Sequence, residues 1–249
     1  MFGFLLSVSL PCIKPVQTHA QRDAEAELYR SILHAIAHKQ YDEALVAGRN
    51  LIVRTNNYGQ VYAKLVQAAK AAGQLEQAKA IFESLLQLSP PNPRGYYGLG
   101  LVYREKGDLA VALEYYKKCF SLQPEFSLPL LELVDTYRKD KRGAEAETYL
   151  KLLAQAYPAS GVVHLALGYY YARERQVEAA VKEIDAAVLI QPSLPEACYH
   201  KALALHLGGR YSDSLTELDR CLRYSPLSRQ KFSENKVDRC SPIFQAVRR

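Results

Sequence analysis

Apolar and polar residues follow each other with the spacing of amphipathic helices along most of this 249-residue chain. Residues 93–126 show the pattern most clearly. A first apolar stripe at i, i+3, i+4 and i+7 is interrupted by Gly107 and Asp108, and a second stripe stops at Pro124. The two stripes consist of Tyr96, Leu99, Gly100 and Tyr103, then Leu109, Ala112, Leu113, Tyr116, Phe120 and Leu122. This segment is therefore predicted to form two helices joined by a short turn.

The same pattern returns at a constant step along the chain. Prolines recur with this step at Pro90, Pro124, Pro158, Pro192 and Pro226. A small residue recurs with it at Ala44, Ala78, Ala112, Ala146, Ala180 and Ser214. Proline stops helices, and an alanine at a fixed position lets two helices approach closely. We therefore expect six helix pairs, over residues 25–58, 59–92, 93–126, 127–160, 161–194 and 195–228.

These windows resemble tetratricopeptide repeats, whose pattern has Leu-Gly at positions 7–8, Tyr at 11, Ala at 20 and Pro at 32. Residues 93–126 carry it as Leu99, Gly100, Tyr103, Ala112 and Pro124. The first and last windows depart from it most, as terminal repeats commonly do. The resemblance implies an all-α fold: an α-solenoid, or right-handed superhelix, of six tandem 34-residue helix-turn-helix repeats.

Residues 1–20 are typical of a secretory signal peptide. An apolar run over residues 1–10 is followed by Pro11, and the small residues Thr18 and Ala20 stand at the −3 and −1 positions of a cleavage site before Gln21. The mature protein is therefore expected to be exported, periplasmic or secreted. No Lys or Arg precedes the apolar run, so a cytoplasmic protein is the alternative. No apolar run reaches the roughly 18 residues of a membrane span.

Charge is concentrated at the C-terminus. The chain has 32 Lys+Arg and 26 Asp+Glu, a net charge of +6, but residues 229–249 hold six basic residues and two acids, which leaves residues 25–228 nearly neutral. A nearly neutral repeat region argues against nucleic-acid binding.

The last repeat has no successor to cover its apolar residues Leu215, Leu218 and Leu222. We expect residues 229–249 to supply a capping helix through Phe232, Val237, Ile243 and Phe244. A homodimer through the C-terminal repeat and a chain that continues further are the alternatives.

The sequence contains no motif that predicts catalysis, a cofactor or a metal centre. His34 and His38 are spaced i, i+4 but have no third ligand at a suitable spacing. We therefore predict a protein that is not an enzyme. Cys198 and Cys221 lie where the last two helices could bring them together, and export would allow a disulfide between them.

The resemblance also implies a partner-binding groove lined by the first helix of each repeat, at positions 2, 5, 9, 12 and 13. These positions give the candidate residues Tyr29, Lys70, Arg94, Tyr97, Arg104, Arg138, Lys139, Tyr169, Arg173 and Tyr199. Only Glu105 and Asp135 oppose the basic groups at these positions, which favours an acidic or apolar segment of another protein. The Lys-Asn pair with which some family members hold a chaperone's C-terminal carboxylate is missing from positions 5 and 9.

A non-catalytic protein-protein interaction scaffold is the function that these residues favour. An exported factor of pilus or outer-membrane assembly is an alternative, because such proteins combine a signal sequence with this kind of repeat. The repeat part of a larger enzyme whose catalytic domain is missing is another.

Overall fold

The protein is described by a computed structural model that covers residues 18–56, 58–194 and 196–224, without the side chains of residues 19 and 222–224. Within these ranges the fold is all-α, with twelve helices and no strand, as the sequence predicts. The predicted signal segment up to residue 17 and the predicted capping segment lie outside the described residues. None of the described helices combines the length and apolar character that a membrane crossing requires.

The chain divides into two compact units between Ala72 and Gly73, inside the window predicted for the second repeat. Unit 1 contains α1 (His19–Ala37), α2 (Tyr41–Arg54) and α3 (Gln60–Ala71). Unit 2 begins with α4 (Leu75–Leu86), α5 (Arg94–Lys106), α6 (Leu109–Leu122), α7 (Leu128–Lys139) and α8 (Gly143–Ala156). It continues with α9 (Gly161–Arg173), α10 (Val177–Ile190), α11 (Ala197–Leu207) and α12 (Tyr211–Tyr224). The even-numbered helices start at a constant interval along the sequence, the same step that separates the prolines.

Unit 1 is built around small residues. Ala35, Ala44 and Ala68 form one buried cluster, with one residue from each helix, and Ile36 and Tyr41 pack against it. Larger side chains such as Leu45, Leu51 and Leu65 are completely buried in the same unit. A capping box starts α1: the Thr18 hydroxyl accepts from the Gln21 amide at 3.2 Å, and the Gln21 side chain accepts from the Thr18 amide at 3.0 Å. The predicted cleavage site before Gln21 falls inside this first turn, so cleavage would remove the cap.

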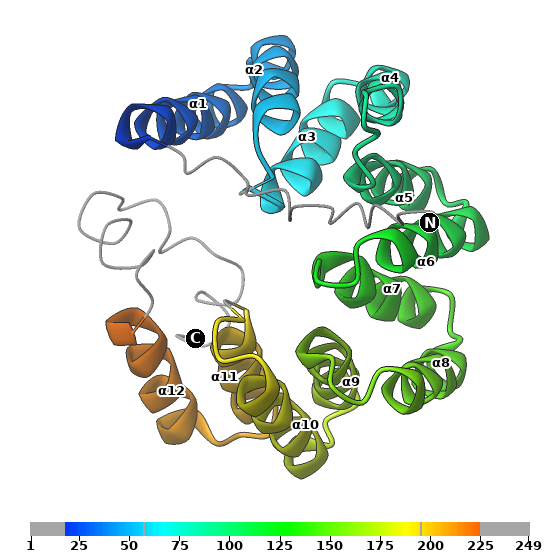
Figure 1. The fold of residues 1–249 in the computed structure, drawn as a ribbon, viewed down its shortest axis with the longest axis vertical. Coiled ribbons are helices and arrows are strands. Elements are labelled where there is room, and N and C mark those ends of the chain that lie inside the picture. Colours follow the sequence, from blue (N-terminus) through cyan, green and yellow to red (C-terminus); the bar gives the residue numbers. More distant parts are fainter. Residues whose placement is uncertain (1–17, 57, 195, 225–249) are drawn as a thin grey trace, which may run out of the picture. The chain divides into compact units, whose positions relative to one another are not determined.

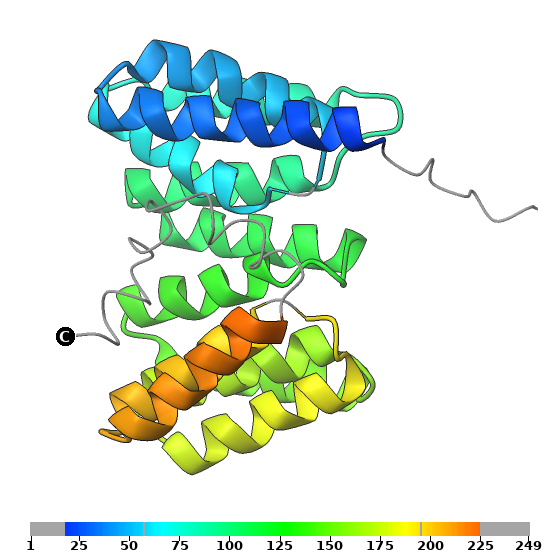
Figure 2. The ribbon, with the colours of Figure 1, turned by 90° about the vertical axis from the view of Figure 1, so that its left-hand side faces the viewer.

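In unit 2 the paired helices also meet at a small residue. The predicted small residues of these pairs, Ala112, Ala146 and Ala180, are all completely buried. Ser214 takes the same place in the last pair, where its hydroxyl donates to the Ala202 carbonyl at 2.7 Å. The side view in Figure 2 shows the green helices α5–α8 lying one above another.

A left-handed residue follows the first helix of every pair. Lys39, Gly73, Gly107, Lys141, Arg175 and Gly209 have φ between 58° and 94°, and they recur with the step of the repeat. In the fourth pair the nearest glycine, Gly143, stands two residues after the left-handed position. Lys141 adopts the left-handed turn instead, and Gly143 is the first residue of α8. The turn is therefore imposed by the packing of the pair even where the residue is not glycine.

More of the apolar surface of the last pair is buried than its sequence indicates. Leu218, expected to lack a partner, is buried with Ala202 and packs beside Tyr199, while Leu215 is half exposed. Lys201 occupies a core position, and its ammonium group reaches Asp185 at 2.8 Å and Glu217 at 3.3 Å. A disulfide joins Cys198 of α11 to Cys221 of α12, whose Cα atoms are 5.8 Å apart.

Gly100 gives a direct test of the close helix approach. A Cβ at this position would lie 2.4 Å from Cε1 of Tyr116, whose ring is completely buried and has no room to move. Gly100→Ala should therefore lower the free energy of unfolding by about 1–3 kcal/mol, measured by urea denaturation. Gly143→Ala is the control, since nothing lies within 4 Å of its Cβ position, and it should raise stability by about 0.5 kcal/mol. Equal effects of the two substitutions would contradict the close approach.

Candidate partner-binding surface

The predicted binding residues of unit 2 lie on its first helices. Figure 1 shows α7, α9 and α11 on the inner side of the curve that unit 2 follows, with α8 and α10 on its outer side. Arg104, Arg138, Lys139 and Arg173 all stand in the last turns of α5, α7 and α9. The negative end of the helix dipole favours basic side chains at these positions. Part of the predicted set of basic residues is therefore explained by helix stability rather than by binding.

Arg104 is half-buried and joins two repeats. Its guanidinium pairs with Glu132 of α7 and lies 3.6 Å from the carboxylate of Glu105. Burial raises the pKa of Glu132, and the charge of Arg104 acts in the opposite direction. The sequence prediction counted only Glu105 and Asp135 on this face and missed Glu132. Because Arg104 pairs with Glu132, it cross-links α5 to α7.

A second set of pairs links α7 with α9. The Arg138 side chain donates to Glu174 at 2.9 Å and to the Arg173 carbonyl at 3.3 Å. Arg173 in turn lies 3.1 Å from Asp135. Between 31 and 36% of each of these four side chains is exposed. Glu174 is a further acid that the sequence prediction missed, so the face is much less basic than expected.

Lys139 is the most exposed of these basic residues, and its ammonium donates to the Arg104 carbonyl at 3.3 Å. Together with Asp135, Arg138, Arg173 and Glu174 it forms a half-exposed set of charges that we call the inner strip. The inner strip offers donors and acceptors side by side. Its five residues carry one positive charge in excess.

Two predicted contact tyrosines belong to the core instead. Tyr97 is only 1% exposed, and its ring meets Phe126 edge-on at 5.2 Å. Tyr169 is 8% exposed; its hydroxyl donates to Asp135 at 2.7 Å and its ring contacts His200 at 4.9 Å. The expectation that these two rings form an open binding surface is therefore wrong, because both rings are buried: that of Tyr97 against Phe126, and that of Tyr169 against His200.

The remaining candidates stay predictions. Arg94 starts α5, where its guanidinium lies 4.0 Å from the centre of the Phe126 ring and donates to Gln123 at 3.2 Å. Tyr199 is half-buried on α11. Tyr29 and Lys70 belong to unit 1, in which Tyr29 stacks on Tyr58 at 5.1 Å and Lys70 is exposed near the end of α3.

The described residues contain no group of three His, Cys, Asp or Glu side chains that could hold a metal ion. His34 and His38 stack on each other at 4.0 Å, and the His38 ring nitrogen Nδ1 lies 2.9 Å from the His34 carbonyl. His164 bonds Glu183 at 2.8 Å. These contacts are those of structural histidines.

His200 gives unit 2 a pH dependence that sequence alone does not indicate. Burial lowers its pKa to about 4, whereas the unfolded chain takes up the proton near pH 6.5. The stability that the neutral ring provides is therefore complete above about pH 6.5 and is lost as the pH falls toward 4. Between about pH 7.5 and 5, wild type should lose about 2 kcal/mol more unfolding free energy than His200→Leu, measured by urea denaturation. Equal losses would show that His200 is already protonated or exposed in the folded protein.

The chain is similar to known proteins in sequence and in fold. Residues 63–119 match the tetratricopeptide repeat family. MamA from Desulfovibrio magneticus is 18% identical, with a TM-score of 0.40, over 71% of this chain and 98% of that one. A thermophilic tetratricopeptide repeat protein from Thermus thermophilus is 21% identical, with a TM-score of 0.41, over 73% and 98% of the two chains. YrrB, a tetratricopeptide repeat protein with an unusual peptide-binding site, is 20% identical, with a TM-score of 0.38, over 72% and 93%.

No curated protein matches the sequence. The family match covers most of the second and third predicted repeats, the segment that contains Ala78, Gly100 and Ala112. The match shows that residues 63–119 resemble tetratricopeptide repeats, and the twelve helices of the described residues give the chain an all-α fold.

Proposed function

We propose that this chain is a non-catalytic scaffold that binds a segment of another protein along the inner strip. The tetratricopeptide repeat fold supports a role in protein interaction. The observation that carries the proposal is the inner strip itself, in which charged side chains of α7 and α9 remain about one-third exposed although they are paired. Because these groups are already exposed, they can form hydrogen bonds with the main chain and side chains of a partner without a change in the fold.

The pairing of the strip bears on the partner's chemistry. Arg138 forms an ion pair with Glu174, and Arg173 forms one with Asp135. A purely acidic partner would therefore be repelled by two carboxylates as well as attracted by three cations. Exposed Lys139 supplies the excess positive charge. We infer a partner segment that places one or two carboxylates at Lys139 and Arg138 and hydrogen-bonds the rest of the strip. Complementary charge of this kind affects mainly the association rate and the choice of partner.

Arg138→Glu combined with Lys139→Glu tests the proposal. Affinity-purified full-length wild type, incubated with extract of the source cells and quantified by mass spectrometry, should retain partners that the double variant retains about tenfold less. Lys151→Glu combined with Lys182→Glu, on the outer helices α8 and α10, reverses the same number of charges and should retain them as wild type does. Equal retention by all three proteins would refute binding at the inner strip. Circular dichroism of each variant verifies the fold.

An exported location is our second proposal, and the disulfide between Cys198 and Cys221 supports it. Disulfides persist in oxidising compartments and are rare in the cytosol. Together with the apolar start of the sequence, this favours an envelope or secreted scaffold, such as an assembly factor of the pilus or outer membrane. The mature protein should then begin at Gln21 and show no free thiol at Cys198 or Cys221, measured by mass spectrometry after thiol alkylation. An intact Met1 with both thiols free would contradict export.

A further inference from the structure

The second helices of unit 2 form a cleft that the inner strip does not involve. It has a volume of about 560 Å³, within the range of ligand-binding sites. Six residues of α6 and one of α8 line it: Val111, Glu114, Tyr115, Lys117, Lys118, Ser121 and Tyr149. We call it the outer cleft. Along α6 the lining runs from Val111 to Ser121, a length of about 15 Å at the helical rise per residue.

Two tyrosines and two lysines give the outer cleft its chemistry. Tyr115 is held in a row of stacked rings, 5.4 Å from Tyr103 and 6.1 Å from Tyr96. The ammonium group of Lys117 lies 5.4 Å from the centre of the Tyr149 ring, and that of Lys118 lies 5.2 Å from the centre of the Tyr96 ring. The rings are thus fixed by packing, and both cations are held beside them.

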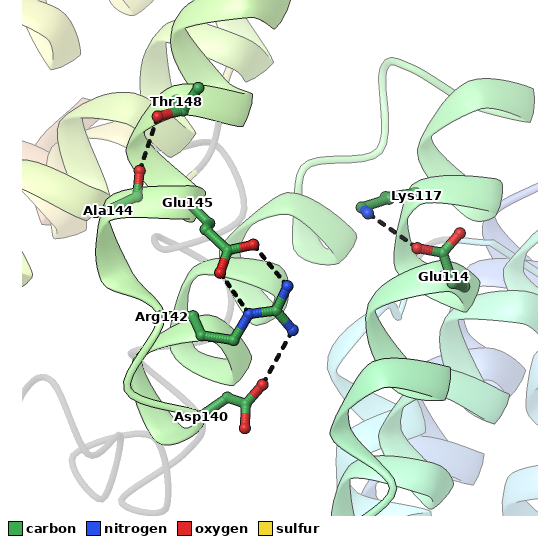
Figure 3. Close-up of polar contacts among 7 residues, drawn as sticks. All are labelled: Glu114, Lys117, Asp140, Arg142, Ala144, Glu145 and Thr148. Atoms are coloured by element: carbon green, nitrogen blue, oxygen red, sulfur yellow. Dashed lines mark hydrogen bonds and ion pairs between the residues drawn. The ribbon is translucent and has the colours of Figure 1, made fainter.

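Charged side chains near the start of α8 form ion pairs, whereas one lysine of α6 does not, among the residues that the structure describes. Figure 3 shows Arg142 bonding both oxygens of Glu145 and one oxygen of Asp140, across from Lys117 and Glu114 on α6. Lys117 pairs with Glu114 at 2.9 Å. In the described part of the chain, no carboxylate forms an ion pair with the exposed Lys118. One positive charge of the outer cleft therefore stays without an acidic partner.

Apolar side chains extend the surface along both helices. Val111 and Leu122 of α6 are 42% and 54% exposed, and Leu152 of α8 is 58% exposed. Leu152 lies seven residues after Glu145 and three after Tyr149, so all three share one helix face. Val111 lines the outer cleft, and Leu122 and Leu152 lie on the two helices that border it, where the apolar stripe of a bound segment could cover them.

We propose that the outer cleft binds an acidic amphipathic helix of a partner protein, at a site separate from the inner strip. The helix lies between α6 and α8. Its apolar stripe packs on Val111, Tyr115 and Tyr149, and a flanking Asp or Glu pairs with Lys118. The groove between two neighbouring helices has the direction and length that a helix of about three turns requires. The chain then joins two partners, one on each face of unit 2.

Selection from a displayed library of random 16-residue peptides tests this proposal with the full chain. Wild type serves as bait, and peptides that also bind the Val111→Asp/Lys118→Glu variant are removed. Both side chains are exposed, so the variant should keep the circular dichroism of wild type. The surviving peptides should carry apolar residues at i, i+3 or i+4, and i+7 beside Asp or Glu. Each should bind the variant at least about tenfold more weakly than wild type.

A matched variant on α10 provides the control. Lys182→Glu combined with Leu189→Asp makes the same changes at an exposed lysine and an exposed apolar residue outside the outer cleft. It should bind the selected peptides within about twofold of wild type, as should the inner-strip variant Arg138→Glu/Lys139→Glu. No surviving peptides, survivors that are basic or lack the apolar stripe, or equal losses with the α10 variant would each overturn the proposal. Equal losses with the inner-strip variant would show that the two sites are not separate.

Discussion

The close approach of the two helices in a pair is the constraint on which the rest of the structure depends. It requires an alanine or serine at one fixed position, and in the third pair it also requires Gly100 against the Tyr116 ring. Once the helices are this close, the turn between them has to pass through a left-handed residue, whether that residue is Gly107 or Lys141. The same spacing then returns with every pair and sets the first helices of unit 2 side by side.

Neighbouring first helices are joined by charge as well as by apolar packing. Arg104 reaches Glu132, and Arg173 reaches Asp135, in each case from one repeat to the next. Pairs that are mostly buried contribute little net stability, but losing one partner leaves the other charge without compensation. These contacts therefore fix the register between repeats, and the parts of them that remain exposed form the inner strip. The function that we propose uses groups whose first role is to hold unit 2 together.

The fold could be predicted from sequence because its signals are local and repeat. Small residues, prolines and apolar stripes each return with the same step, so an all-α fold of repeated helices follows from the pattern alone. The surface could be predicted only in part. Tyr97 and Tyr169 stand at positions that line a groove in related repeats, but their rings are buried against Phe126 and His200. The acids Glu132 and Glu174 lie 28 and 36 residues from the arginines that they bind. No sequence motif predicts an ion pair between residues that far apart in the chain.

A double-mutant cycle on Arg104 and Glu132 tests the central claim, that ion pairs cross-link adjacent repeats of unit 2. The unfolding free energies of wild type, Arg104→Met, Glu132→Gln and the double variant are measured by urea denaturation at neutral pH. If the ion pair is a cross-link, each single variant has a lower unfolding free energy than wild type. The loss in the double variant is then smaller than the sum of the two single losses, by a coupling energy of about 1–3 kcal/mol. Losses that add to within about 0.5 kcal/mol would show that the two side chains do not interact in the folded protein.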